Sequence, residues 1–490
     1  AERELVIASR ARMRRNRRLR MAAVASLAVL AVAASVSAFI ATVERDRAAT
    51  EASTAARTME FMVSLFAEAD PTERRGEEVT VREVLDRGAA EVERGLEDQP
   101  AVRASLMTAM GRAYTGLGLH EPAHRLLSTA VEQRERLIGA RARPTTEARS
   151  ALGAVLYMQS RYEEAERIFR QALHDARELA PEGDPLVSQA LNGLALTLTQ
   201  QGRDAEAEAL YREALVIDER LHGRRHLDTA RTIKGLAMSL SFAGRYAEAE
   251  LRLREALDLH RELLGPSHVR VAECENDLGG LYYQMGRYAD ASRQFELALA
   301  TYTRVLGPDH PDLAAVENNI GRSLLMDGRI EQAEPRLRAA LELDRRSKPP
   351  GHDDFALPLN SLAMIEMHRG NLEAAETYLD EALEIVRRHD HWLLDQVLLN
   401  RAVLDILRGH LEEARDVLTE SRAALESQYP LATMPEERWR YALHDSASAL
   451  LLIGEKRFSE AEALLVGARE AIDARFPTGG YYPELVLDRL

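Results

Sequence analysis

The chain has 490 residues, with 79 acidic and 64 basic side chains and a formal net charge of −15. Residues 1–20 carry +6 and residues 21–43 carry no charge, so the remainder carries −21. An acidic body argues against a nucleic-acid-binding surface spread over the fold, because phosphate neutralisation needs clustered cations. The single cysteine, Cys274, excludes a disulfide framework and a multi-cysteine metal site. From these residues we expect no cofactor and no bound metal.

The uncharged segment 21–43 is long enough to cross a membrane. As a helix it would extend about 34 Å, against a hydrocarbon core of roughly 30 Å. Arginines crowd its N-terminal side and Glu44 and Asp46 follow it, so the positive-inside bias predicts that residues 1–20 are a cytoplasmic juxtamembrane segment. The alternative is a secretory signal peptide cleaved near Ala38. The expected location is thus an inner or cell membrane, spanned once, with a homodimer through the small residues of 21–43 as a further option.

Residues 44–98 are predicted to form connecting and capping helices. Met59, at the start of an apolar stripe with helical spacing, lies in a helix that Pro71 ends. Thr80 and Glu83 then form a capping box at the start of a second helix. Its apolar face extends to Leu96. These helices are expected to cover the exposed end of the region that follows.

That region is a repeat of period 42. A glycine marks each step, with Ser160 as the one exception: Gly118, Gly202, Gly244, Gly286, Gly328 and Gly370. Alanines follow each step by five and twelve residues, and a Gly or Ala precedes it by seven. Small residues at these spacings let the two helices of a hairpin pack closely. We call this series of regularly spaced small residues the comb. Its next glycine, Gly409, is out of register, and Gly454 restores the register. The series predicts about nine hairpins over residues 99–490.

The pattern resembles the tetratricopeptide repeat, as in GRDAEAEALYREAL (202–215) and GRYAEAELRLREAL (244–257). LGPDHPDLAAVENNIG (306–321) and the 42-residue period are similar to the kinesin-light-chain type of this repeat. The resemblance implies an all-α fold, a right-handed superhelix of helical hairpins, and a concave groove that takes a protein or an extended peptide.

Two further resemblances concern the N-terminal part. EFMVSLFAEADP (60–71) and REVLDRGAAEVERGLEDQP (82–100) resemble the stretch between membrane helix and repeats in bacterial transmembrane Ser/Thr protein kinases. RELVIASRARMR (3–14) is similar to a segment that ends the NTPase half of some bacterial STAND-type signalling proteins. Because the sequence begins with Ala1, we expect an upstream portion that carries any catalytic domain; these residues contain no P-loop and no kinase catalytic loop, and no catalytic residue is assigned among them.

One polar position recurs in the first helix of the hairpins. It lies three residues before the Gly or Ala that precedes the turn by seven. It is occupied by Asn192, Lys234, Asn276, Asn318 and Asn360. Asparagine is a poor helix former, so its recurrence needs a reason. The resemblance to kinesin-light-chain repeats implies that these residues line the peptide groove, where each amide can bond a peptide backbone. The alternative is that they bond between adjacent helices and set the repeat angle.

Several residues suggest other chemistry. His120, Glu121 and His124 spell the H-E-x-x-H zinc motif, but the motif is expected to straddle a hairpin turn and has no third ligand at a plausible spacing. His389-Asp390-His391 also lacks a third ligand. Cys274 is expected to be a packing residue without an activating histidine.

Histidines also recur at the start of the first helices, and they are His226, His268, His310 and His352. Their hairpins are expected to stack about 10 Å apart, which is too far for one ion to reach two of them. We therefore interpret them as repeat-boundary residues.

Three functions remain open on the sequence. The first is a membrane-anchored scaffold that binds a protein or peptide, as the sensing or docking part of a bacterial signalling protein. The second is a structural self-assembly module, and the third is a zinc hydrolase using His120, Glu121 and His124. If the groove shares the acidity of the repeats, it favours basic peptides.

Overall fold

The computed structural model describes residues 53–54, 56–59, 80–180, 183–388, 391–432, 434 and 437–475. The predicted juxtamembrane and transmembrane segments, 1–20 and 21–43, lie outside the described residues. Among the residues described, no helix combines the length and the apolar character that a membrane crossing requires.

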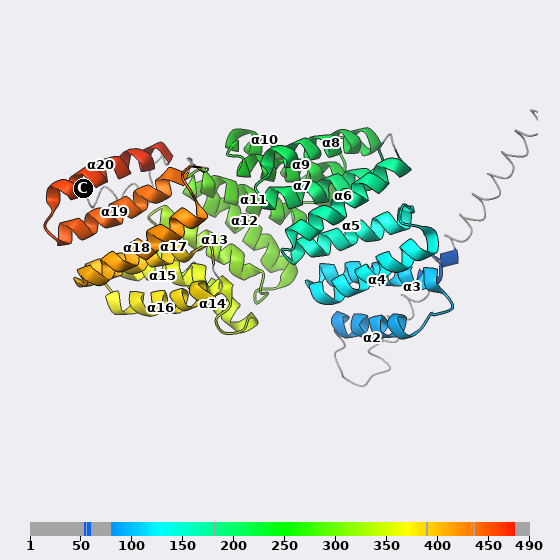
Figure 1. Ribbon diagram of the computed structural model, residues 1–490, viewed down its shortest axis with the longest axis horizontal. Helices are drawn as coiled ribbons and strands as arrows, with labels where there is room; N and C mark the ends of the chain where they lie inside the picture. The colour runs from blue at the N-terminus through cyan, green and yellow to red at the C-terminus, as the bar shows by residue number, and fades with distance from the viewer. Residues whose placement is uncertain are drawn as a thin grey trace, which may run out of the picture. The chain divides into compact units, whose positions relative to one another are not determined.

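The described part of the chain is helical, without strands, and falls into two compact units divided between Gly193 and Leu194 (Figure 1). Unit 1 contains α2 (Val81–Arg94), α3 (Pro100–Gly116), α4 (His120–Ile138), α5 (Arg143–Met158) and α6 (Tyr162–Leu179). The division falls inside α7 (Pro185–Gln200).

Unit 2 holds the remaining helices. They are α8 (Asp204–His222), α9 (Leu227–Phe242), α10 (Tyr246–Leu264), α11 (Val269–Gln284), α12 (Tyr288–Leu306), α13 (Leu313–Met326), α14 (Ile330–Ser347), α15 (Ala356–His368), α16 (Leu372–Arg388), α17 (Leu394–Arg408), α18 (Leu411–Gln428), α19 (Arg438–Gly454) and α20 (Phe458–Arg475), with a short 3₁₀ turn, η1 (Asp353–Phe355). From α3 to α20 the described helices form nine successive helix–turn–helix units, which agrees with the predicted number.

The predicted glycines form the turns within these units. Gly244 has φ +73°, and the chain closes behind it with a bond from the Arg245 N–H to the Leu240 carbonyl at 2.9 Å. This left-handed conformation has little cost for glycine, and Ser160 adopts it at φ +58° in the step without one.

The last step of the predicted comb is wrong. Gly454 is the final residue of α19, and Lys456, at φ +65°, takes the left-handed position. The equivalent closing bond joins the Arg457 N–H to the Leu452 carbonyl at 2.8 Å. The physical reason is that the closing bond, not the glycine, defines the turn, and here a lysine tolerates the strained backbone.

Small residues bring the helices of each hairpin together, as predicted. A Cβ on Gly279 of α11 would lie 2.8 Å from the ring of Phe295 on α12, and one on Gly321 of α13 would lie 2.6 Å from Leu337 on α14. The comb alanines are fully buried, among them Ala249. Large side chains on the second helices therefore fill the space that glycine leaves on the first.

The predicted cap of α2 is present. The Glu83 N–H donates to Thr80 Oγ1, and the Thr80 N–H donates to the Glu83 carboxylate. Buried apolar residues of α2, such as Val92, pack where α2 contacts α3. Leu96 differs from the expectation, because α2 ends at Arg94 and Leu96 lies beyond it with φ +61°.

Within unit 2 the first helices of successive hairpins are neighbours: α9 contacts α11, α11 contacts α13, α13 contacts α15, and α15 contacts α17. A position that recurs with the 42-residue period is therefore repeated on adjacent helices. This arrangement places the recurring polar position of the sequence on neighbouring first helices.

Candidate functional site

Four of the five predicted groove residues come together on adjacent helices of unit 2. They are Lys234 on α9, Asn276 on α11, Asn318 on α13 and Asn360 on α15, and we call this set of positions the first-helix face. The fifth, Asn192, lies in unit 1, where its Nδ2 donates to the Ser188 carbonyl one turn earlier at 3.0 Å.

Lys234 forms ion pairs with the next first helix, α11. Its Nζ lies 3.1 Å from Glu273 and 3.5 Å from Asp277, both on α11. Burial favours the neutral amine, but the carboxylates of Asp277 and Glu273 outweigh it and raise the pKa of Lys234. Burial raises the pKa of Asp277, against the opposing effect of Lys234. One cation thus faces two carboxyl groups, of which Glu273 is the more exposed.

Asn276 and Asn318 hold buried oxygens without a protein donor. The Oδ1 atoms of both side chains are shielded from solvent and accept no hydrogen bond from any described residue. Asn276 as a whole is half-buried, and Asn318 is 8% exposed. A buried amide oxygen without a donor costs free energy, so two such groups one period apart need an explanation.

Asn360 has a partner on the following first helix. Its Oδ1 accepts from Asn400 Nδ2 of α17 at 2.8 Å. Asn360 and Lys234 therefore both make the contacts between adjacent helices that the alternative interpretation predicted, and Asn276 and Asn318 do not make them through their oxygens.

Sequence reasoning missed further contacts between first helices. Ser241 of α9 donates to Gln284 of α11 at 3.1 Å. Arg322 of α13 donates to the Tyr283 hydroxyl of α11 at 3.2 Å and lies over its ring. No periodic pattern marks these residues.

An Arg–Glu ladder along the second helices was also missed, although the sequence contains a signal for it. Arg245 follows the turn glycine Gly244 and binds Glu248 in its own repeat and Glu208 in the preceding one, at 2.8 and 2.7 Å. Arg287 repeats the pattern with Glu250 at 3.2 Å. The recurring Gly-Arg dipeptide with an acidic residue three positions after the arginine could have indicated it.

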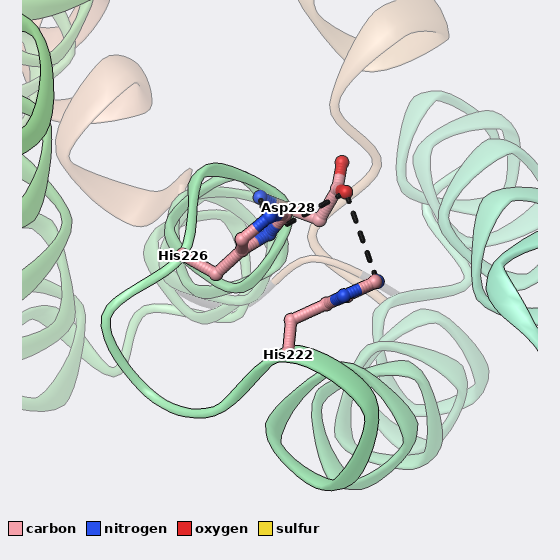
Figure 2. A group of neighbouring side chains, drawn as sticks. All are labelled: His222, His226 and Asp228. Atoms are coloured by element: carbon pink, nitrogen blue, oxygen red, sulfur yellow. Dashed lines mark hydrogen bonds and ion pairs between the residues drawn. The ribbon is translucent and has the colours of Figure 1, made fainter.

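The H-E-x-x-H residues do not assemble a metal site. The motif opens α4 and does not straddle the turn as expected, because Gly118 and Leu119 complete the turn before His120. Glu121 accepts from Gln159 at 2.8 Å, and His124 lies 3.3 Å from Arg161. Within the described ranges, the side chains that could hold an ion together are His222, His226 and Asp228 (Figure 2).

The periodic histidines have the structural role expected of repeat-boundary residues. Each Nδ1 accepts a hydrogen bond from the backbone N–H two residues later, as in an N-cap. This bond is made by His226, His268, His310 and His352, and also by His391, which lies outside the 42-residue period. The N-cap itself is a histidine in α9, α11 and η1. His389 and Asp390 lie outside the described residues.

The expectation that no histidine lies beside Cys274 is wrong. His260 of α10 places its Nδ1 3.5 Å from Cys274 Sγ. Burial raises the pKa of the thiol to about 12 and lowers the pKa of His260. A thiol that stays protonated is a poor nucleophile, so the pair packs as part of the core.

The sequence matches the tetratricopeptide repeat family over residues 102–178, 186–262, 236–304, 275–346, 354–427 and 318–389, which together make up more than half of the chain. No match was found among curated proteins.

Solved structures with a similar fold include the apo form of RapI and the apo form of the quorum sensor NprR from B. thuringiensis. RapI is 15% identical with a TM-score of 0.54, over 76% of this chain and 98% of RapI. NprR is 15% identical with a TM-score of 0.51, over 77% of this chain and 100% of NprR. BtubC from P. vanneervenii is 26% identical over 52% of this chain and 94% of its own, with a TM-score of 0.37.

Proposed function

Because the chain belongs to the tetratricopeptide repeat family, we propose that the first-helix face of unit 2 binds an extended segment of a protein partner. The all-helical repeat scaffold is of a kind suited to protein–protein interaction. The observation that carries the proposal is the pair of amide side chains, Asn276 and Asn318, whose oxygens accept no hydrogen bond from the residues that the structure describes. A peptide backbone supplies both donors and acceptors at regular spacing, and rotation of the carboxamide can present either of its polar groups.

The charges beside these amides favour a basic segment. Glu273 and Asp277 share the single ammonium group of Lys234, and the side chain of Glu273 is 41% exposed. A lysine or arginine of the bound segment would pair with the exposed carboxylate of Glu273. The surface that recognises the partner thus combines backbone capture by amides with a preference for positive charge.

The sequence supports a wider proposal. The basic segment 1–20 and the apolar segment 21–43 support a single-pass anchor in a bacterial membrane, with the repeats as the sensing or docking part of a signalling protein. The coding sequence on the N-terminal side of Ala1 tests the link: a kinase or NTPase domain would support it, and an unrelated domain would contradict it.

Peptide binding is tested with the purified full chain and an array of random twelve-residue peptides, followed by fluorescence anisotropy on the strongest binder. We expect basic peptides to dominate, and the Asn276→Ala/Asn318→Ala variant to bind roughly tenfold more weakly or worse, as expected for two lost hydrogen bonds. Asn371→Ala is the matched control, because Asn371 lies in a turn and donates to Glu366 at 2.7 Å.

Unchanged affinity in the double variant would overturn the assignment of these amides. Tight binding of a strongly acidic peptide at low salt would overturn the charge preference. Sedimentation velocity at several concentrations tests the self-assembly alternative, which predicts a concentration-dependent oligomer without any peptide.

A further inference from the structure

Two histidines and an aspartate converge where α8 passes into α9. His222 lies in the last turn of α8, His226 directly precedes α9, and Asp228 is its second residue (Figure 2). Gly223, at φ +79°, reverses the chain between them. Asp228 Oδ2 lies 3.5 Å from His226 Nδ1 and 4.0 Å from His222 Nε2, and all three candidate ligand atoms lie within 4.8 Å of one another.

Local contacts hold these side chains in place. The two imidazole rings stack with centroids 4.3 Å apart and planes 19° from parallel. Asp228 Oδ1 pairs with Arg231 at 2.9 Å, so Oδ2 is the oxygen that faces both rings. All three residues are partly exposed, which gives an ion access from solvent.

Comparison with the following repeats shows that His222 is not needed for the turn. His268 caps α11 as His226 caps α9, and His310 accepts the equivalent bond from the N–H two residues later, just before α13, at 3.1 and 3.3 Å. The position four residues before the cap is His222 here, but Leu264 and Leu306 in those repeats. The second histidine is therefore an addition peculiar to this turn, and leucine is compatible with the fold at its position.

We propose that His222, His226 and Asp228 bind a first-row transition dication of the zinc class, at a site independent of the peptide-binding face. Imidazole nitrogen and carboxylate oxygen are ligands typical of such ions, and three protein ligands leave a fourth position for water. Zn–N bonds are about 2.1 Å, so the ligand atoms must approach to about 3.4 Å of one another. The two stacked rings must therefore rotate when an ion binds, so that both ring nitrogens point toward it.

Binding has a defined local cost. His226 Nδ1 accepts from the Asp228 N–H at 3.2 Å, and an ion at that nitrogen replaces this cap. Arg224 and Arg225 are neutralised by Glu255 and Glu262, whereas Arg231 pairs with Asp228 itself, so its charge opposes the ion and adds to the cost of binding. The bound ion would tie the end of α8 to the start of α9.

The test uses Zn²⁺ alone, added to the metal-free full chain in competition with a chromophoric chelator. We expect one zinc ion bound in the micromolar range, with Tm raised in proportion to its occupancy. His222→Leu restores the residue of the neighbouring repeats, and we expect it to weaken binding roughly tenfold or more and to abolish the rise in Tm. Asp228→Asn is expected to weaken binding as well.

The matched control is His268→Asn, which changes the equivalent cap in the next repeat and keeps a capping side chain. It is expected to bind zinc as the unaltered chain does. Co²⁺ gives a second readout, because visible absorption bands of a bound four-coordinate ion should appear in the unaltered chain and disappear in His222→Leu. Equal zinc affinity in His222→Leu and the unaltered chain would overturn the site, as would the lack of any zinc binding in the unaltered chain.

Discussion

In two pairs of neighbouring first helices in unit 2, the side chain at the same repeat position makes different contacts with the next helix. Between α9 and α11, the ammonium of Lys234 lies between two carboxylates. Between α15 and α17, Asn360 accepts from Asn400, a neutral contact. At the start of α17, Asp395 is 2% exposed and its Oδ1 accepts no hydrogen bond from a described residue. Its pKa is raised to about 6, chiefly by burial, although Arg440 opposes the shift.

The comparison shows what a buried carboxylate needs. Lys234 provides a cationic side chain in direct contact with Asp277, whereas the burial of Asp395 is opposed by the more distant charge of Arg440 and by backbone hydrogen bonds at the start of α17. The repeat position of Lys234 and Asn360 therefore accepts a polar side chain. The partner that the neighbouring helix offers determines whether a charged side chain or an amide fits there. Three experiments test this difference.

The largest change in the free energy of unfolding is expected for a substitution of Lys234. Lys234→Met leaves Glu273 and Asp277 facing each other without a cation. Removing one member of a fully buried ion pair costs roughly 3–5 kcal/mol, and the partial exposure of Lys234 reduces this to about 3 kcal/mol. Urea unfolding at pH 7 measures the loss. The double variant Lys234→Met/Asp277→Asn should recover about half of it, and a single-variant loss below about 0.5 kcal/mol would contradict the assigned role.

A gain in stability is expected at Asp395. Its folded pKa of about 6 exceeds the unfolded value of about 3.9, so the folded state binds the proton more tightly. The group's contribution to stability is fully present below pH 4 and is lost as the pH rises through 6. Asp395→Asn should therefore be more stable at pH 7 by about 2 kcal/mol, and its stability should vary less between pH 4 and 7.

Thermal unfolding at several pH values checks this expectation. Glu384→Gln is the control, since the carboxylate of Glu384 on α16 is 72% exposed. Identical pH profiles for Asp395→Asn and the unaltered chain would show that Asp395 does not titrate as its burial predicts.

The smallest effects separate paired from unpaired asparagines. Asn360→Ala leaves Asn400 Nδ2 without its acceptor and should cost about 1–2 kcal/mol. Asn276→Ala and Asn318→Ala remove oxygens that accept no hydrogen bond from a described residue, so each should change stability by less than about 0.5 kcal/mol. Denaturant midpoints compare the three variants. Equal losses of stability at all three positions would favour a purely structural role for these asparagines.

The period of the sequence was sufficient to predict most of the fold. A small residue seven positions before each turn and a large one on the second helix specify how a hairpin closes, because both act within about 40 residues of chain through simple steric fit. The turn at Lys456 escaped prediction since a glycine two residues away completed the comb, while the backbone placed a lysine in the left-handed conformation.

The site was predicted less completely. The period identified which residues face a neighbouring first helix, but not whether that helix supplies a partner. Asn360 contacts Asn400 and Lys234 contacts Glu273. The equivalent oxygens of Asn276 and Asn318 have no donor among the described residues. Such pairings depend on the rotation and offset between stacked helices, which no single repeat encodes.

The sequence by itself determined a helical repeat with its turns, its small-residue contacts and its histidines at the repeat boundaries, because these follow from local backbone geometry and residue size. Only the tertiary structure decided the contact of Cys274 with His260, the pairing of Lys234, and the convergence of His222 with Asp228. Each of these joins side chains on different helices. Their contact depends on where the chain turns and how the next helix packs, and the one-dimensional pattern does not contain that information.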